Sequence, residues 1–167
     1  TLVVGGGIAG ITTALEMADE HEVILIEKEP FLGGHMIGLS KTFPTLDCSQ
    51  CILTPKMVAV HNHPNITMLT QTEVADVSGS PGDYSITLKH SPRYVDIEKC
   101  ISCGACSRKC PAGAIFLPFA QAVPQAYIID MSKCTKCGTC VKVCPRDAIN
   151  LEAREEKTTI SVGAVAI

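Results

Sequence analysis

The chain contains the pattern Cys-x2-Cys-x2-Cys-x3-Cys-Pro twice, and this repeat constrains the fold more than any other feature. Residues 95–117 and 129–151 are identical at 11 of 23 aligned positions, which indicates duplication of one small unit. Disulfides across two intervening residues are strained, so the pattern argues against a disulfide scaffold and favours metal ligands. The eight thiols are Cys100, Cys103, Cys106 and Cys110, then Cys134, Cys137, Cys140 and Cys144.

This spacing is typical of proteins that hold two 4Fe–4S clusters, in which the fourth cysteine of each run reaches the other cluster. We therefore expect cluster one on Cys100, Cys103, Cys106 and Cys144, and cluster two on Cys134, Cys137, Cys140 and Cys110. Two structural zinc sites are the alternative, but zinc knuckles need one Cys-x2-Cys pair each and leave the full repeat unexplained. The region resembles bacterial-type two-cluster ferredoxins, which carry electrons one at a time.

A glycine-rich turn near the start of the chain predicts a dinucleotide site. Gly5-x-Gly7-x-x-Gly10 follows an apolar strand over 2–4 and opens a helix with one apolar face, and the next strand ends at Glu27. The dinucleotide fingerprint has this order, with a pyrophosphate at the helix N-terminus and the acidic side chain on the ribose. A purely structural turn is the alternative.

The residues that follow favour FAD over NAD. The run 27–30, Glu-Lys-Glu-Pro, followed by Gly33-Gly34, resembles glutathione-reductase-like flavoproteins, where a second glycine pair lies beside the flavin phosphates. The resemblance implies binding roles for Gly5, Gly7, Ile8, Ala9, Gly10, Glu27, Lys28, Gly33 and Gly34. In those proteins a later Ala-Thr-Gly motif closes the site. Here it would fall beyond Ile167, so whether this chain holds FAD alone stays open.

We expect a partial α/β Rossmann-like FAD-binding domain that is interrupted by an α+β ferredoxin module with two 4Fe–4S clusters. The FAD domain is predicted over 1–94, the inserted module over 95–151, and the return of the FAD domain over 152–167, with one strand at 158–167. Further strands are predicted at 65–69, 73–77 and 84–89, and a short helix at 55–60. Because both ends lie within predicted strands, we expect the chain to be part of a longer polypeptide.

Residues 42–57 form the most distinctive string in the sequence, and they contain two further cysteines, Cys48 and Cys51. This pair can be half of a third 4Fe–4S cluster that thiols from elsewhere complete, which is the favoured interpretation. It can also be a redox-active dithiol, as in thioredoxin reductases. In the third interpretation both thiols are buried small hydrophobes.

Charge and hydropathy exclude several function classes. The formal net charge is −3 and the pI is about 5.9, so the chain lacks the basic surface that nucleic-acid binding needs. It contains no run of about 18 apolar residues that would span a membrane, and no export leader. Dense thiols of this kind indicate a reducing cytoplasm. No Ser–His–Asp set or useful carboxylate pair is found, so no catalytic residues beyond electron transfer are expected.

The glycine turn, the run 27–34, the string 42–57 and the inserted ferredoxin together resemble the heterodisulfide reductase A-subunit family of methanogenic archaea and their anaerobic relatives. The resemblance implies an electron-transfer subunit with FAD and iron–sulfur clusters. In that family the flavin splits electron pairs from a hydrogenase or formate dehydrogenase module. One electron goes to a low-potential ferredoxin and the other to a partner subunit that reduces the CoM–CoB heterodisulfide. Other domains of the family are absent, so complete bifurcation is not expected here.

Three alternatives compete with this resemblance. One is a flavin and ferredoxin oxidoreductase of the glutamate synthase small-subunit type, which commonly carries its clusters outside the flavin domain. Another is the quinone-interacting relative found in sulfate reducers, which needs a membrane partner. The last belongs to a different class: a ferredoxin-like carrier with a degenerate glycine turn and no flavin. Flavin content separates this carrier from the others.

Overall fold

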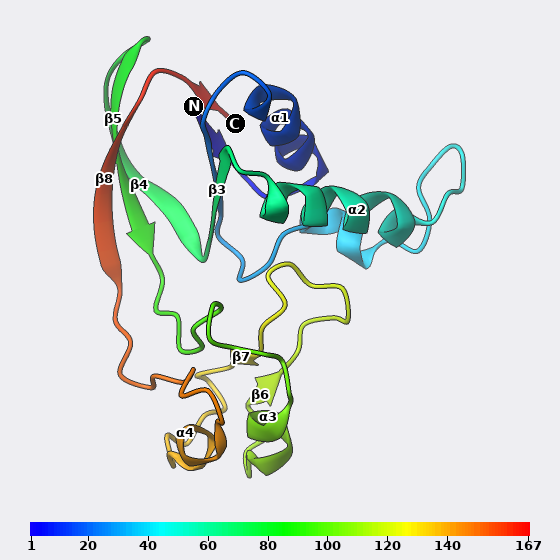
Figure 1. Ribbon diagram of the computed structural model, residues 1–167, viewed down its shortest axis with the longest axis vertical. Coiled ribbons are helices and arrows are strands. Elements are labelled where there is room, and N and C mark those ends of the chain that lie inside the picture. Colours follow the sequence, from blue (N-terminus) through cyan, green and yellow to red (C-terminus); the bar gives the residue numbers. More distant parts are fainter. The chain divides into compact units, whose positions relative to one another are not determined.

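A computed structural model describes residues 1–167 and divides the chain into two compact units (Figure 1). One unit contains Thr1–Ser91 and Glu156–Ile167, and the other contains Pro92–Glu155. The domain ranges 1–94, 95–151 and 152–167 remain a prediction. None of the helices combines the length and apolar character needed to cross a bilayer.

The first unit contains a parallel sheet with the strand order β3-β2-β1-β9. These strands are β1 (Leu2–Val4), β2 (Val23–Glu27), β3 (Ile66–Thr70) and β9 (Val165–Ala166). The helix α1 (Ile8–Ala18) connects β1 to β2, which gives the β-α-β unit that the sequence predicts. Since the turn before α1 lies at the carboxyl end of β1, it is placed where ligands bind in parallel sheets.

Helices cover this sheet through small apolar faces. Ile11, Ala14 and Ala18 of α1 are buried. The 3-10 helix η1 (Gly34–Gly38) precedes α2 (Ser49–Asn62), whose Leu53 and Met57 are fully buried. The predicted helix at 55–60 is therefore longer and begins six residues earlier. Cys48 extends it, because its sulfur accepts a hydrogen bond from the backbone N–H of Cys51 at the helix start.

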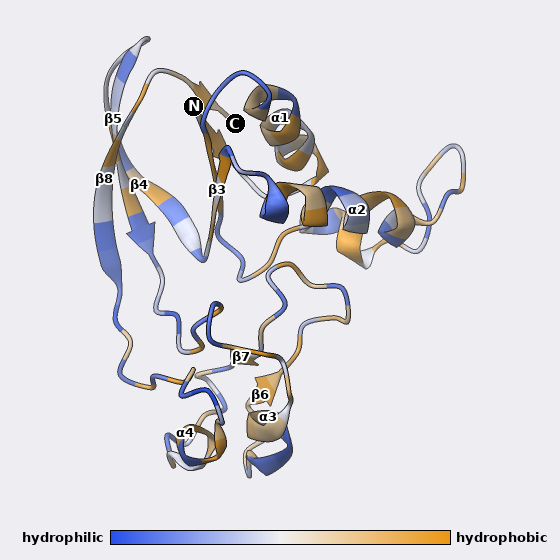
Figure 2. Cartoon of the chain, in the orientation of Figure 1, coloured by the Kyte–Doolittle hydropathy of each residue, from blue (hydrophilic) through white to orange (hydrophobic).

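A three-stranded antiparallel sheet packs on the other face. It has the order β4-β5-β8, formed by β4 (Thr72–Ser80), β5 (Asp83–His90) and β8 (Glu156–Val162). The buried side chains that join the two sheets are Leu2, Ile26, Ile86, Leu88 and Val162. In Figure 2 the exposed start of β8 is coloured hydrophilic, in contrast to its buried end.

The single strand predicted at 158–167 is wrong. The segment contains β8, which pairs antiparallel with β5, and β9, which pairs parallel with β1. Gly163 separates them, and its carbonyl accepts a hydrogen bond from the Gly82 N–H, while the carbonyl of Ala164 accepts one from Leu2. The chain therefore changes sheets within two residues, which an apolar pattern alone does not reveal.

The second unit shows the duplication in its hydrogen bonds. Asp96 N–H donates to the Ala148 carbonyl at 2.8 Å, and Asp130 N–H, one repeat later, donates to the Ala114 carbonyl at 2.8 Å. Each repeat thus begins against the end of the other. The repeats contribute α3 (Ala105–Lys109) with β6 (Ile115–Phe116), and β7 (Ile128–Ile129) with α4 (Thr139–Val143). The core is small and contains Val95, Ile115, Ile129, Cys140 and Ile149.

Candidate functional site

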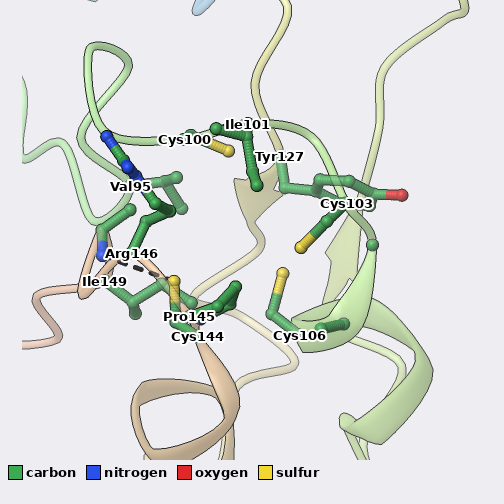
Figure 3. Close-up of a pocket in the computed structure, with 13 residues that line it drawn as sticks. Val95, Cys100, Ile101, Cys103, Cys106, Tyr127, Cys144, Pro145, Arg146 and Ile149 are labelled. Carbon is green, nitrogen blue, oxygen red and sulfur yellow. Dashed lines mark hydrogen bonds between the residues drawn. The ribbon is translucent and has the colours of Figure 1, made fainter.

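The first cavity in the second unit is lined by cysteines from both repeats. Three of them, Cys100, Cys103 and Cys106, come from the first repeat, and Cys144 comes from the second. Figure 3 shows the sulfur atoms of Cys103, Cys106 and Cys144 facing a common space. The empty space, counted out to its mouth, is about 340 Å³. The structure therefore brings together the four thiols that the sequence assigns to cluster one.

The second cavity repeats this arrangement with the roles of the two repeats exchanged. Cys134, Cys137 and Cys140 line it together with Cys110, and its empty space is about 280 Å³. Matching backbone donors reach the fourth cysteines: Ala114 N–H lies 3.3 Å from Cys110 Sγ, and Ala148 N–H lies 3.4 Å from Cys144 Sγ. Hydrogen bonds of this kind stabilise thiolate ligands and tune cluster potentials.

Two equivalent backbone turns, at Gly104 and Gly138, position the neighbouring cysteines at the cavities. Gly104 and Gly138 have φ angles of 72° and 74°, which favour glycine, and each follows an exposed cysteine. The two short helices then carry the chain to Cys110 and Cys144. The reciprocal hydrogen bonds between repeats bring each fourth cysteine to the other cavity.

The cluster thiols differ in burial and in hydrogen bonding. Burial raises the pKa of the Cys106 and Cys140 thiols. The Thr139 hydroxyl lowers the pKa of Cys137, whose sulfur lies 3.4 Å from the Thr139 oxygen. Metal ligands must be deprotonated, so a bound cation lowers the pKa of its thiol ligands. This effect is largest for the buried thiols, whose pKa burial has raised.

The donor set fits multi-iron clusters better than single ions. One zinc ion binds thiolates at about 2.3 Å, so its four sulfur ligands must gather closely around a single point. No group of three or more His, Cys, Asp or Glu side chains is close enough to hold one metal ion. Four cysteines line each cavity, and four thiolates are the ligand set of a 4Fe–4S cluster.

The glycine-rich turn in the first unit leaves room for a ligand at one glycine and none at another. A Cβ atom added to Gly10 would lie 1.9 Å from the carbonyl oxygen of Gly5, so this glycine lets α1 approach β1. A Cβ atom added to Gly7 would meet nothing within 4 Å. Gly7 is also the N-cap of α1 and provides no side-chain cap, and the first turn has no acidic residue. The open helix start suits a pyrophosphate.

The second glycine pair and the acidic residue lie beside this turn. Gly33 N–H donates to the Gly6 carbonyl at 2.7 Å, and a Cβ atom on Gly34 would lie 3.0 Å from the Cα of Gly7. Glu27 is buried, and one carboxylate oxygen accepts a 2.6 Å hydrogen bond from Gly6 N–H. Its other oxygen accepts from Glu29 N–H at 2.8 Å. Each carboxylate oxygen has a second lone pair with which it can accept from a ribose hydroxyl.

The remaining predicted dinucleotide residues differ in position. Ile8 and Ala9 form the first turn of α1, so their backbone N–H groups are at the open helix start. Lys28 is exposed, and its charge helps to lower the pKa of Glu73 in β4, after the larger effects of Lys89. The structure thus gathers the glycines, Ile8, Ala9 and Glu27 at one turn, and places Lys28 on the surface.

Cys48 and Cys51 lie at the start of α2, and both are exposed. The interpretation of this pair as buried small hydrophobes is therefore wrong, because only the residues on the other side of α2 pack inward. Hydrogen bonding from the Cys51 thiol, and then from its backbone N–H, lowers the pKa of Cys48. The same thiol contact raises the pKa of Cys51.

We expect the two thiols to react at different rates in metal-free, reduced protein. A lowered pKa leaves more thiolate at neutral pH, and the thiolate is the nucleophile. Iodoacetamide should therefore modify Cys48 before Cys51 near neutral pH, and the difference should shrink as the pH rises above the ordinary thiol pKa. Peptide mass spectrometry over a time course measures both rates. Equal rates near neutral pH would contradict the hydrogen-bonded arrangement.

Sequence reasoning missed two residues at cluster one. Tyr127 lines the first cavity, and its hydroxyl would lie 2.8 Å from a Cβ atom on Gly104. Arg108 lies beside the same glycine, and its guanidinium donates a hydrogen bond to the Cys103 carbonyl at 3.1 Å. Neither belongs to the cysteine pattern. The only sequence signal for Arg108 is that the second repeat has another cation, Lys142, at the equivalent position. No sequence signal points to Tyr127.

Two family models match the chain. Residues 99–148 match a 4Fe-4S dicluster domain, and residues 3–56 match an NAD(P)-binding Rossmann-like domain. These matches confirm the predicted fold class and the prediction of two 4Fe–4S clusters.

Curated relatives match almost the whole chain. It is 46% identical to the iron-sulfur A-subunit of CoB–CoM heterodisulfide reductase from Methanocaldococcus jannaschii, over 98% of this chain and 27% of that protein. It is 51% identical to one such A-subunit of Methanopyrus kandleri, with the same shares covered. A solved structure of L-proline dehydrogenase from P. horikoshii has a TM-score of 0.45 at 25% identity, over 53% of this chain and 18% of that chain.

The chain spans about a quarter of the length of the curated relatives that it matches. The similarity includes the glycine-rich turn and both cysteine repeats, because the alignments cover 98% of the chain. The chain belongs to the heterodisulfide reductase A-subunit family.

Proposed function

We propose that this chain is the part of an electron-transfer subunit that holds FAD and two 4Fe–4S clusters. The observation that carries the proposal is the pair of four-cysteine cavities in the same chain as a glycine turn that is open at Gly7. FAD, when bound, can take up electrons in pairs and release them singly, which complements clusters that carry one electron each. The chain's own residues would hold these groups.

The ligand roles follow from the cavities. Cys100, Cys103, Cys106 and Cys144 would hold one cluster, and Cys134, Cys137, Cys140 and Cys110 the other. At the FAD site, backbone N–H groups of Ile8 and Ala9 would bind the pyrophosphate, and Glu27 would accept from the ribose. Gly7 leaves open space beside the helix start, and Gly34 lies against the Gly7 backbone, where a Cβ atom would be 3.0 Å from the Gly7 Cα.

The exposed thiols of Cys48 and Cys51 support a third cluster site that is completed by thiols from elsewhere. The surface around them also carries apolar side chains: Phe43 is 92% exposed and Leu46 is 61% exposed. A pair of thiols provides half of the four ligands that a cluster needs. Further protein would both complete this ligand set and cover the apolar side chains.

The partners are inferred from the relatives. One relative, from Methanococcus maripaludis, is named as the A-subunit of an H2/formate:CoB-CoM heterodisulfide,ferredoxin reductase and is 45% identical to this chain. By this similarity the chain would work with other subunits of a heterodisulfide reductase complex, with a hydrogenase or formate dehydrogenase module, and with ferredoxin. The ten cysteines, none of which forms a disulfide, favour the reducing cytoplasm as its location.

Iron, acid-labile sulfide and flavin per chain, measured on material isolated without oxygen, test the proposal. We expect about eight irons, about eight sulfides and one FAD. About twelve irons in the presence of partner subunits would support the third cluster. Eight irons without flavin in the complete complex would favour a ferredoxin-like carrier instead. Zinc in place of iron would overturn the proposal.

A further inference from the structure

The two cluster sites are related by the repeat, yet the turns that follow Cys103 and Cys137 differ in burial. Cys103 and Cys137 are equivalent and both are exposed. The glycine that follows each one differs: Gly104 is buried, and Gly138 is half-buried. The thiol positions are therefore alike, whereas solvent and a partner have unequal access to the adjacent backbone.

At cluster one, neighbouring groups cover the turn. A Cβ atom on Gly104 would lie 2.8 Å from the Tyr127 hydroxyl and 2.9 Å from an Arg108 guanidinium nitrogen. Just before Cys103, the Ser102 hydroxyl donates to the Gln125 carbonyl at 2.6 Å. The loop that ends at Tyr127 therefore closes over this turn, and the guanidinium of Arg108 is directed at the Cys103 carbonyl.

At cluster two, the equivalent turn is open. A Cβ atom on Gly138 would meet nothing within 4 Å. The positions equivalent to Ser102 and Arg108 are Lys136 and Lys142, and both lysines are exposed. The turn after Cys137 is therefore open and has two exposed lysines beside it, whereas the turn after Cys103 is covered.

The unit that contains both cluster sites differs in charge from the rest of the chain. Between residues 92 and 155 there are nine Lys and Arg against six Asp and Glu, a formal charge of +3, whereas the whole chain has −3. The unit that contains the clusters is thus basic within an acidic chain. A net positive charge of this kind raises the encounter rate with a negatively charged partner.

We propose that the second cluster site is where this module exchanges electrons with an acidic carrier protein. The docking face contains Lys136, Cys137, Gly138, Thr139 and Lys142 and is called the exchange face. One electron moves from the reduced carrier to the oxidised cluster at this face, and no bond forms or breaks. The proposal rests on the proposed function, since it needs both clusters to be bound.

Stopped-flow mixing of the cluster-loaded chain with a reduced acidic two-cluster ferredoxin, used as the probe, measures the second-order rate of cluster reduction. For the natural sequence the rate should fall as ionic strength rises. In the double variant K136E/K142E it should be about tenfold lower at low ionic strength, and its salt dependence should be lost or reversed. Both lysines are exposed, so the variant is expected to fold and to load with iron.

The matched control is K41E/K157E, which changes the net charge equally on two exposed lysines of the other unit. Its rate should stay within about twofold of the natural sequence. Equal slowing in both double variants, or no slowing in K136E/K142E, would overturn the exchange face. Reduced methyl viologen, a small cation, should reduce both clusters in every variant. Failure to load iron in the natural sequence would instead overturn the proposed function, and the exchange face with it.

Discussion

Substitution of Cys144 by serine is expected to remove the cluster that is bound mainly by the other repeat. Cys144 lies in the second repeat but lines the cavity of Cys100, Cys103 and Cys106. Serine is a poor ligand for the soft iron–sulfur core. Iron should therefore fall from about eight to about four per chain. The EPR spectrum of the reduced protein should change from two interacting clusters to one.

Two double variants decide whether the ligand sets are shared between repeats. If Cys144 serves the first cavity, C103S/C144S damages one cluster and keeps about four irons, whereas C137S/C144S damages both and keeps almost none. If each repeat held its own cluster, these two results would be exchanged. Because both variants lose two cysteines, general loss of thiols cannot account for a difference between them. Iron and sulfide analysis of the two proteins, prepared in parallel, reads out the answer.

The sequence predicts the features that follow from short-range spacing. The cysteine repeat specifies its ligands because turn geometry brings Cys100, Cys103 and Cys106 to one point whatever surrounds them. The β-α-β unit is predictable for the same reason, since glycine spacing and apolar periodicity act within about 25 residues. Both predictions concern local geometry, in which few alternatives compete.

Features that depend on tertiary context are not predictable in this way. The passage from β8 to β9 divides one apolar run between two sheets, and the partners that decide this, β5 and β1, are far away in the sequence. Likewise, Tyr127 covers Gly104 from a loop of irregular structure, where no periodicity exists. The burial of Cys48 and Cys51 is open at the level of sequence for a similar reason: a cysteine on a helix can face either side, and the inward face is set by Leu53 and Met57.

Two alanine substitutions in the glycine-rich turn are both expected to weaken FAD binding, but only one of them is expected to destabilise the fold. In G10A the new Cβ would lie 1.9 Å from the Gly5 carbonyl oxygen, which is backbone and has little freedom to move. Helix α1 must then shift from β1, at a cost of about 1–3 kcal/mol or more. Denaturant unfolding should show this loss, and FAD binding should fall with it.

In G7A the fold should survive while the ligand is excluded. Gly7 has φ −77°, which alanine adopts without strain, and the new methyl group would enter open space. The unfolding free energy should therefore stay within about 1 kcal/mol of that of the natural sequence, because alanine restricts the unfolded chain but is a poorer N-cap than glycine. FAD binding should nevertheless weaken by at least about tenfold, since the methyl group occupies the space beside the helix start where the pyrophosphate would lie. Flavin content of the complete complex, together with unfolding of the chain, separates the two variants. If G7A retained FAD at full affinity, the open turn would be structural, and the dinucleotide would have to lie elsewhere.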